Sequence, residues 1–141
     1  MEQREGASRQ PIAVVGVACR LPGGVSSLDE LWSALDEGRD LVGGHLADRF
    51  EAERFVDTAV PRPGKSYTAA GGFLDDVASF DASYFGISPA EAEQMDPQHR
   101  LLLELTAEAL DDAAIDPRSL AGSHTAVHVG ISDASYGALQ L

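Results

Sequence analysis

The sequence predicts an α/β fold built around a parallel sheet. Two short apolar runs rich in β-branched residues, at 12–18 and 125–131, have the pattern of strands covered by helices on both faces. Amphipathic stretches with helix start signals lie between them, so the order is strand, helix, excursion, helices, strand. That alternation is typical of strands that helical crossovers join within one sheet.

The first strand is followed by a helix. A Leu-Pro-Gly-Gly break at 21–24 ends the strand. Ser27 and Glu30 then have the spacing of a capping box, in which each side chain accepts a free backbone N–H of the other. Gly38 stands where such a helix would stop. The apolar residues between these signals recur at helical spacing: Leu28, Leu31, Trp32 and Leu35.

Residues 39–72 predict an ordered but loop-rich excursion, because glycine and proline recur and the apolar spacing is irregular. Apolar and aromatic residues return over 73–87, and we expect them to attach the excursion to the core.

Two helices meet near Asp96. The segment 88–91, Ser-Pro-Ala-Glu, is a second capping box with proline at the first helical position. Asp96 and Pro97 must end that helix, because the residue before proline is disfavoured in α geometry, and they begin another over 97–114. The apolar face of this second helix is wide, which predicts that the helix is buried on more than one side. That face is made of Leu101, Leu102, Leu103, Leu105, Ala109, Leu110 and Ala113. Asp116 opens a last short turn before the second strand.

Composition and charge exclude several kinds of partner. The 141 residues are 44% hydrophobic, and the net charge is −13. Such a charge repels nucleic acid and anionic lipid, so we expect neither nucleic acid nor a membrane as a partner. The start lacks the apolar core of a secretion signal, and one cysteine, Cys19, forms no intrachain disulfide, which favours a cytoplasmic location. We expect a polar tail at 1–10 and a domain over 11–141.

Two motifs suggest nucleotide binding, but their settings contradict it. Gly-Lys-Ser at 64–66 ends like a phosphate-binding P-loop, yet Ala59 replaces the first required glycine. Pro61 and Pro63 also remove two N–H donors from the loop. No G-x-G-x-x-G fingerprint follows the first strand. No cofactor-binding residue is assigned, and no cofactor is expected.

The residue types that commonly act in catalysis or bind metals are not spaced in the sequence so as to predict a shared site. Cys19 beside Arg20 could be a nucleophile, but a small buried side chain is the simpler interpretation. In a strand, His124 and His128 would be roughly 13 Å apart, too far to share a metal. The remaining candidates are isolated or belong to a solvated acidic stretch: His45, His99, Glu51, Glu53 and Asp57. No catalytic residue and no metal ligand is assigned.

Several short motifs occur in a recognisable order. They include Pro-Ile-Ala-Val-Val-Gly at 11–16 and Phe-Gly-Ile-Ser-Pro at 85–89, and they end with Met-Asp-Pro-Gln-His-Arg at 95–100. The others lie at 18–24, 31–32, 38–40, 64–67, 71–77 and 80–82. Together they resemble the start of the ketosynthase (β-ketoacyl synthase) domain of modular type I polyketide synthases. Aromatic residues are common in the family at Leu21, Ala107 and His128, and glutamine at His99, which leaves the subclass open.

The resemblance implies the N-terminal portion of a thiolase-like fold, with an incomplete parallel or mixed sheet flanked by helices. It implies a parent acyltransferase that performs decarboxylative Claisen condensation, usually as a homodimer. In that family a cysteine takes an acyl chain from the phosphopantetheine arm of an acyl carrier protein, and two histidines assist decarboxylation of a malonyl-type extender.

The family's nucleophile lies in a Thr-Ala-Cys-Ser-Ser type of motif that does not occur in this chain. Cys19 matches a different family segment, and the family's two catalytic histidines come later still. We therefore expect a ketosynthase fragment that ends before the catalytic cysteine and is inactive alone. The alternative is a non-catalytic interaction module that pairs with a full-length synthase.

Overall fold

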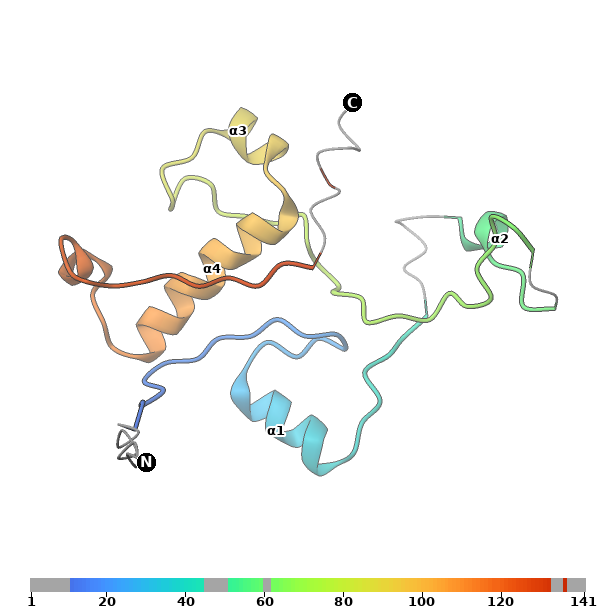
Figure 1. The fold of residues 1–141 in the computed structure, drawn as a ribbon, viewed down its shortest axis with the longest axis horizontal. Helices are drawn as coiled ribbons and strands as arrows, with labels where there is room; N and C mark the ends of the chain where they lie inside the picture. Colours follow the sequence, from blue (N-terminus) through green and yellow to red (C-terminus); the bar gives the residue numbers. More distant parts are fainter. Residues whose placement is uncertain (1–10, 45–50, 60–61, 133–135, 137–141) are drawn as a thin grey trace, which may run out of the picture.

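The computed structural model describes residues 11–44, 51–59, 62–132 and 136. The predicted tail at 1–10 and His45 lie outside these residues. The described helices are α1 (Leu28–Asp36), α2 (Ala52–Phe55), α3 (Pro89–Gln94) and α4 (Pro97–Asp112), and a 3-10 turn follows at Pro117–Leu120. The longest of them, α4, runs diagonally past the segments that come before and after it (Figure 1).

The predicted capping box of α1 is confirmed. The Ser27 hydroxyl accepts the Glu30 N–H at 3.2 Å, and the Glu30 carboxylate accepts the N–H groups of Ser26 and Ser27 at 2.8 and 3.1 Å. The hydrogen bonds that the Glu30 carboxylate accepts from Ser26 and Ser27 lower the pKa of Glu30, and the bond from the Ser26 backbone has the largest effect. Gly38 follows the helix with φ +63°, a left-handed conformation that glycine adopts without strain.

The predicted boundary between α3 and α4 is also confirmed. The Ser88 hydroxyl accepts the Glu91 N–H at 3.3 Å, and the Asp96 carboxylate accepts the Gln98 N–H at 2.9 Å. The α4 helix ends at Asp112, slightly before the predicted 114, because Ala114 turns to φ +54°. Local cap chemistry therefore determines where both helices begin.

The two predicted strands are wrong as hydrogen-bonded strands. Within the described residues, β pairing consists of three isolated bridges: Leu21 with Val25, Gly43 with Gly71, and Val56 with Ser66. Residues 12–18 and 125–131 instead run as irregular, extended segments in the same direction across the view (Figure 1). A strand needs a neighbour to complete its hydrogen bonds, and the described part of the chain supplies none to either segment.

The expected burial of these segments and of α4 is also wrong. The side chains of Ile12 and Val127 are 94% and 82% exposed, and none of the residues of α4 is fully buried. Among the described residues, the buried apolar side chains are those of Val25, Ala34 and Ala52. Too few layers are present to cover the faces that the sequence makes apolar.

One of the two segments nevertheless packs directly on α4. A methyl group added at Gly16 would overlap the Ala109 carbonyl oxygen and lie 2.8 Å from the Ala113 side chain. The next residue, Val17, donates its N–H to the Asp112 carboxylate at 2.9 Å. The absence of a side chain at Gly16 therefore lets the segment lie against the last turns of α4.

The excursion is loop-rich, as predicted, and includes the short helix α2. Aromatic rings gather where it returns: the rings of Phe80 and Phe85 stack with centroids 5.3 Å apart, and Tyr84 meets Phe85 edge-on at 4.9 Å. Arg100 of α4 donates a hydrogen bond to the Ala78 carbonyl at 3.1 Å. This bond ties the end of the excursion to α4.

Replacing Gly16 by alanine tests the docking of the first segment on α4. The added methyl group forces the segment away from the helix at a cost of roughly 1–3 kcal/mol. We expect the Val17 amide to exchange its hydrogen at least fivefold faster in hydrogen-exchange measurements on the full chain. Gly130→Ala is the matched control, since no atom lies within 4 Å of the added methyl group. An unchanged rate at Val17 in Gly16→Ala would contradict the docking.

Replacing Ser27 by alanine tests the capping box. Loss of the cap destabilises a helix by about 1 kcal/mol, so the amides of α1 should exchange roughly fivefold faster. Ser33→Ala, inside the same helix, removes a hydroxyl but no cap and should leave these rates unchanged or lower them. Equal acceleration in both variants would show that the cap does not stabilise α1.

Candidate functional site

A bidentate ion pair between distant parts of the chain joins Arg20 to Glu108 on α4. The guanidinium binds both oxygens of the carboxylate: Nη1 donates to Oε2 at 2.8 Å, and Nη2 pairs with Oε1. Nη1 also donates to the Cys19 carbonyl at 3.0 Å. The hydrogen bond to Glu108 is the main reason that the pKa of Arg20 is raised, so its charge is permanent. The 88 residues that separate the partners explain why no sequence spacing predicted the pair.

Cys19 is half-buried at the edge of a hollow of about 400 Å³. The side chains that line it include three carboxylates, those of Asp29, Glu108 and Asp112. Nucleophilic cysteines lie in electropositive surroundings that favour the thiolate, whereas the charged residues that line this hollow are all acidic. The guanidinium of Arg20, which could favour a thiolate, is instead bound by Glu108. These surroundings are those expected of a small packed side chain at Cys19 rather than of a nucleophile.

The Gly-Lys-Ser segment at 64–66 is not the start of a helix. Ser66 donates its N–H to the Phe55 carbonyl at 2.7 Å and its hydroxyl to the Thr68 carbonyl at 2.7 Å. The Lys65 ammonium binds the Arg54 carbonyl. The groups that would cradle a phosphate in a P-loop therefore serve a local turn and one bridge.

The described histidines lie apart in the structure. His99 is exposed in the first turn of α4, while His124 and His128 are exposed in the extended segment that follows the 3-10 turn. Because that segment is not helical, the four-residue spacing of His124 and His128 does not place them on one helix face.

The acidic residues of the excursion pair with neighbouring arginines. Glu51 contacts Arg54 at 3.2 Å and Asp57 contacts Arg62 at 3.4 Å. Glu53 is exposed on α2. In the portion of the chain that the structure describes, His, Cys, Asp and Glu form no group of three or more that could hold a metal ion.

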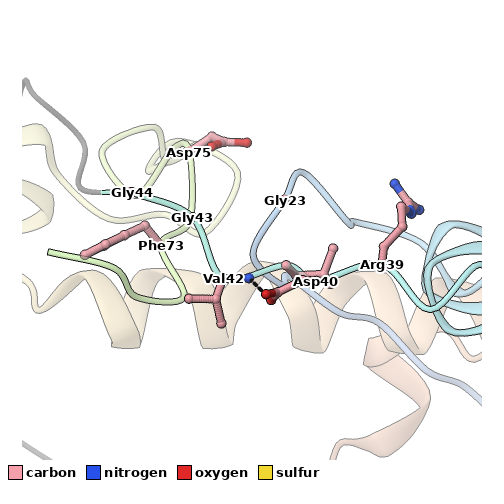
Figure 2. Close-up of a pocket in the computed structure, with 9 residues that line it drawn as sticks. Gly23, Arg39, Asp40, Val42, Gly43, Gly44, Phe73 and Asp75 are labelled. Atoms are coloured by element: carbon pink, nitrogen blue, oxygen red, sulfur yellow. Dashed lines mark hydrogen bonds between the residues drawn. The ribbon is translucent and has the colours of Figure 1, made fainter. Parts of the chain in front are cut away.

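A second hollow, of about 340 Å³, lies where the loop after α1 meets the returning excursion (Figure 2). Asp40 accepts the Val42 N–H at 2.9 Å, so its carboxylate stabilises a local turn. Arg39 contacts the Glu37 carboxylate at 3.2 Å and the Glu30 carbonyl at 3.3 Å, and it lies on the opposite side of Figure 2 from Phe73. The charged groups of this loop hold the loop itself and do not converge on a substrate.

No helix among the described ranges is long and apolar enough to cross a bilayer.

Comparison with known proteins identifies the family of the chain. Residues 9–141 match the family described as "Beta-ketoacyl synthase, N-terminal domain". The chain is 49% identical over 138 residues to the phenolphthiocerol synthesis polyketide synthase type I Pks15/1 of Mycobacterium bovis, covering 97% of this chain and 6% of that protein. It is 48% identical over 132 residues to the pikromycin polyketide synthase component PikAII of Streptomyces venezuelae, covering 93% of this chain and 4% of that one.

Solved structures give the same result. The oxazolomycin ketosynthase domain OzmH KS7 of Streptomyces albus is 42% identical and matches with a TM-score of 0.71, covering 77% of this chain and 19% of that one. A ketosynthase from module 6 of the bacillaene synthase of Bacillus subtilis is 33% identical with a TM-score of 0.65, covering 77% and 18%. The chain thus spans less than a fifth of these two solved ketosynthase chains.

These matches support the resemblance that the motifs predicted. The structural likeness is to thiolase-like ketosynthase domains, although the described residues form helices and almost no sheet. The chain belongs to the β-ketoacyl synthase N-terminal domain family and corresponds to the N-terminal part of a ketosynthase domain of modular type I polyketide synthases.

Proposed function

We propose that residues 11–141 supply the first strands and helices of a ketosynthase domain that catalyses decarboxylative Claisen condensation. The family match and the identity of about 49% to a type I polyketide synthase support this proposal. The docking of residues 16–20 on α4, through Gly16 and through the pair of Arg20 and Glu108, is a scaffold feature of the kind such a domain needs.

The proposed reaction of the complete domain has two stages. A cysteine thiolate attacks the thioester of an acyl chain on a carrier protein, which forms a new thioester on the enzyme and releases the carrier's thiol. A malonyl-type extender then loses carbon dioxide, and the resulting carbanion attacks the acyl-enzyme carbonyl. The new carbon–carbon bond expels the cysteine thiolate and leaves a β-ketoacyl chain on the extender's carrier.

The assignment of the catalytic residues to another part of the domain rests on the surroundings of Cys19. It is the one cysteine of the sequence, and it lies beside carboxylates while its neighbouring guanidinium is bound by Glu108. The nucleophile and its histidines are therefore assigned to the rest of the domain. We infer that this chain alone does not take up acyl groups.

The partners follow from the same assignment. An acyl carrier protein bearing phosphopantetheine is the proposed donor and acceptor of acyl groups, since the relatives are polyketide synthases. A homodimer is the proposed state of the complete domain, and its proposed location is the cytoplasm.

A chimeric ketosynthase tests the proposed function. Residues 11–141 of this chain replace the matching segment of the oxazolomycin ketosynthase domain, to which the chain is 42% identical. We expect the chimera to be acylated by an acyl-pantetheine thioester, and intact-mass measurement detects the adduct. The same chimera with Cys19→Ser should be acylated equally, because Cys19 is not the nucleophile. A well-folded chimera without acylation would favour the non-catalytic interaction module.

The isolated chain provides the complementary measurement. After incubation of the full 141-residue chain with the same thioester, we expect its intact mass to remain unchanged. Acylation of Cys19, located by peptide mapping and abolished by Cys19→Ser, would overturn the assignment of the nucleophile to another part of the domain.

A further inference from the structure

We propose that a groove along α4 binds a basic, amphipathic helix of another polypeptide. The groove lies between α4 and the aromatic segment that contains Tyr84 and Phe85, and we call it the α4 groove. One half of the groove is apolar and the other half is acidic. The proposal does not depend on the reaction proposed above.

The α4 groove consists of two hollows that share Tyr84, Phe85 and Ala107. The first hollow has a volume of about 310 Å³, and its other apolar lining residues are Leu103, Leu110 and Pro117. The second hollow has a volume of about 280 Å³, and its charged lining residues are Asp81, Glu104, Glu108, Asp111 and Arg20. An occupant of both hollows must therefore combine an apolar part with positive charge.

The apolar half has room for one large apolar side chain. Leu103, Ala107 and Leu110 follow one another on the same face of α4, and the middle one contributes only a methyl group. The hydroxyl of Thr106, which also lines this hollow, donates a hydrogen bond to the Leu102 carbonyl at 2.6 Å. A large apolar side chain beside Ala107 would act as the kind of anchor that contributes most of the affinity in helix and peptide recognition.

The acidic half carries charge that the described part of the chain does not neutralise. Glu108 is bound by Arg20, but none of the other three carboxylates forms a salt bridge among the described residues: Asp81, Glu104 and Asp111. Hydrogen bonds to Asp81, the one from the Ser83 hydroxyl foremost, lower the pKa of that carboxyl and favour its ionised form. This half of the groove therefore attracts a cationic partner.

The groove lies on the side of α4 that is opposite the first extended segment. Gly16 lies against Ala109, and Val17 binds Asp112. Successive residues of a helix are rotated by about 100°, so Ala107 lies about 160° around the helix from Ala109. A sheet built on the first segment would cover that opposite side of α4 and leave the groove open.

A helix with two basic residues seven positions apart matches the groove. Glu104 and Asp111 are also seven positions apart, which is about 10 Å along the helix axis, so each can pair with one basic residue. Apolar residues three and four positions after the first basic residue would then lie opposite Ala107. The apolar anchor supplies affinity, and the two ion pairs set the orientation of the bound helix.

A second copy of this chain does not have this pattern. Among the described helices, α1 and α3 contain no lysine or arginine, α2 contains Arg54 alone, and α4 contains Arg100 alone. Two copies would also bring together two net charges of −13, which repel each other. We therefore commit to a basic helix of a different polypeptide as the occupant.

Peptide binding tests the proposal. The probe is an alanine-based helical peptide with arginines seven positions apart and leucines three and four positions after the first arginine. We expect the full 141-residue chain to bind it at least tenfold more tightly than a peptide with glutamates in place of the arginines, as measured by fluorescence anisotropy. Binding should weaken as salt is added, because salt screens exposed charges. No binding, or equal binding of the two peptides, would overturn the proposal.

Substitutions of charged residues locate the acidic half. Glu104→Gln combined with Asp111→Asn removes both expected ion pairs, so binding should weaken about fivefold. Glu93→Gln combined with Asp36→Asn is the matched control, because it removes the same charge from exposed positions outside the groove, and its binding should change less than twofold. Equal weakening by both double variants would show general attraction by the acidic chain and would refute the groove.

A substitution that fills the apolar half gives an independent test. The ring of Ala107→Phe would occupy the hollow, so this variant should bind the peptide at least tenfold more weakly with its charges unchanged. Ala90→Phe, at an exposed position on α3, adds the same ring outside the groove and should bind like the unchanged chain. Circular dichroism checks that helix content is equal in these variants. Unchanged binding by a well-folded Ala107→Phe chain would contradict the apolar anchor.

Sedimentation separates the proposed occupant from a second copy. We expect the chain alone to be a monomer, and the mixture with the arginine peptide to contain one chain and one peptide. A homodimer that the peptide dissociates would assign the groove to a second copy and overturn the proposal. None of these measurements uses acylation, so their failure and the failure of the proposed reaction are distinguishable.

Discussion

The close approach of residues 16–20 to α4 is the constraint on which the arrangement of this chain depends. Gly16 lies against the Ala109 backbone, and four residues later Arg20 is held by both oxygens of Glu108. Val17 also binds Asp112, one helical turn after Glu108, so the contacts determine the position and the direction of the segment together. The exposed side-chain fractions of Arg20 and Glu108 are 29% and 42%, and exposed ion pairs of this kind contribute at most about 1 kcal/mol. The ion pair between Arg20 and Glu108 therefore acts mainly on geometry. Gly16 permits the close approach of the segment to α4, and the ion pair sets its register along the helix.

The helices were predictable because their signals are local. The caps at Ser27, Ser88 and Asp96 each act within four residues, and the structure contains all three. At Ser88 the predicted box is only half formed, since the Ser88 hydroxyl accepts the Glu91 N–H but no bond from the Ser88 N–H to the Glu91 carboxylate accompanies it. The strands were predicted from residue types that favour sheets, but a ladder requires a neighbour that local sequence does not supply. The pair of Arg20 and Glu108 is non-local in the same sense. Gly16 was the one signal available, since a glycine inside a strand pattern often marks a close backbone approach.

Function was accessible through motifs rather than through the geometry of a site. Residue spacing alone assigned no catalytic residue, and the resemblance, which runs from Pro11 to the last residues, indicated a ketosynthase before any contact was known. In the structure, Lys65 and Ser66 bind backbone carbonyls of their own loop region, and carboxylates line the hollow beside Cys19. A chain that corresponds to less than a fifth of a solved ketosynthase can present family motifs whose use depends on residues elsewhere in the domain.

The open edges at 12–17 and 125–131 also bear on how such a protein is made. Ribosomes add about 5–20 residues per second, so the 141 residues of this chain take roughly 7–28 seconds to synthesise. During that interval the capped helices can form, because their contacts lie nearby in the chain, whereas residues 12–17 and 125–131 find no backbone partner among the described residues. Chaperones that shield nascent β edges, and the acidic charge that keeps neighbouring nascent chains apart, therefore matter most at this stage of synthesis.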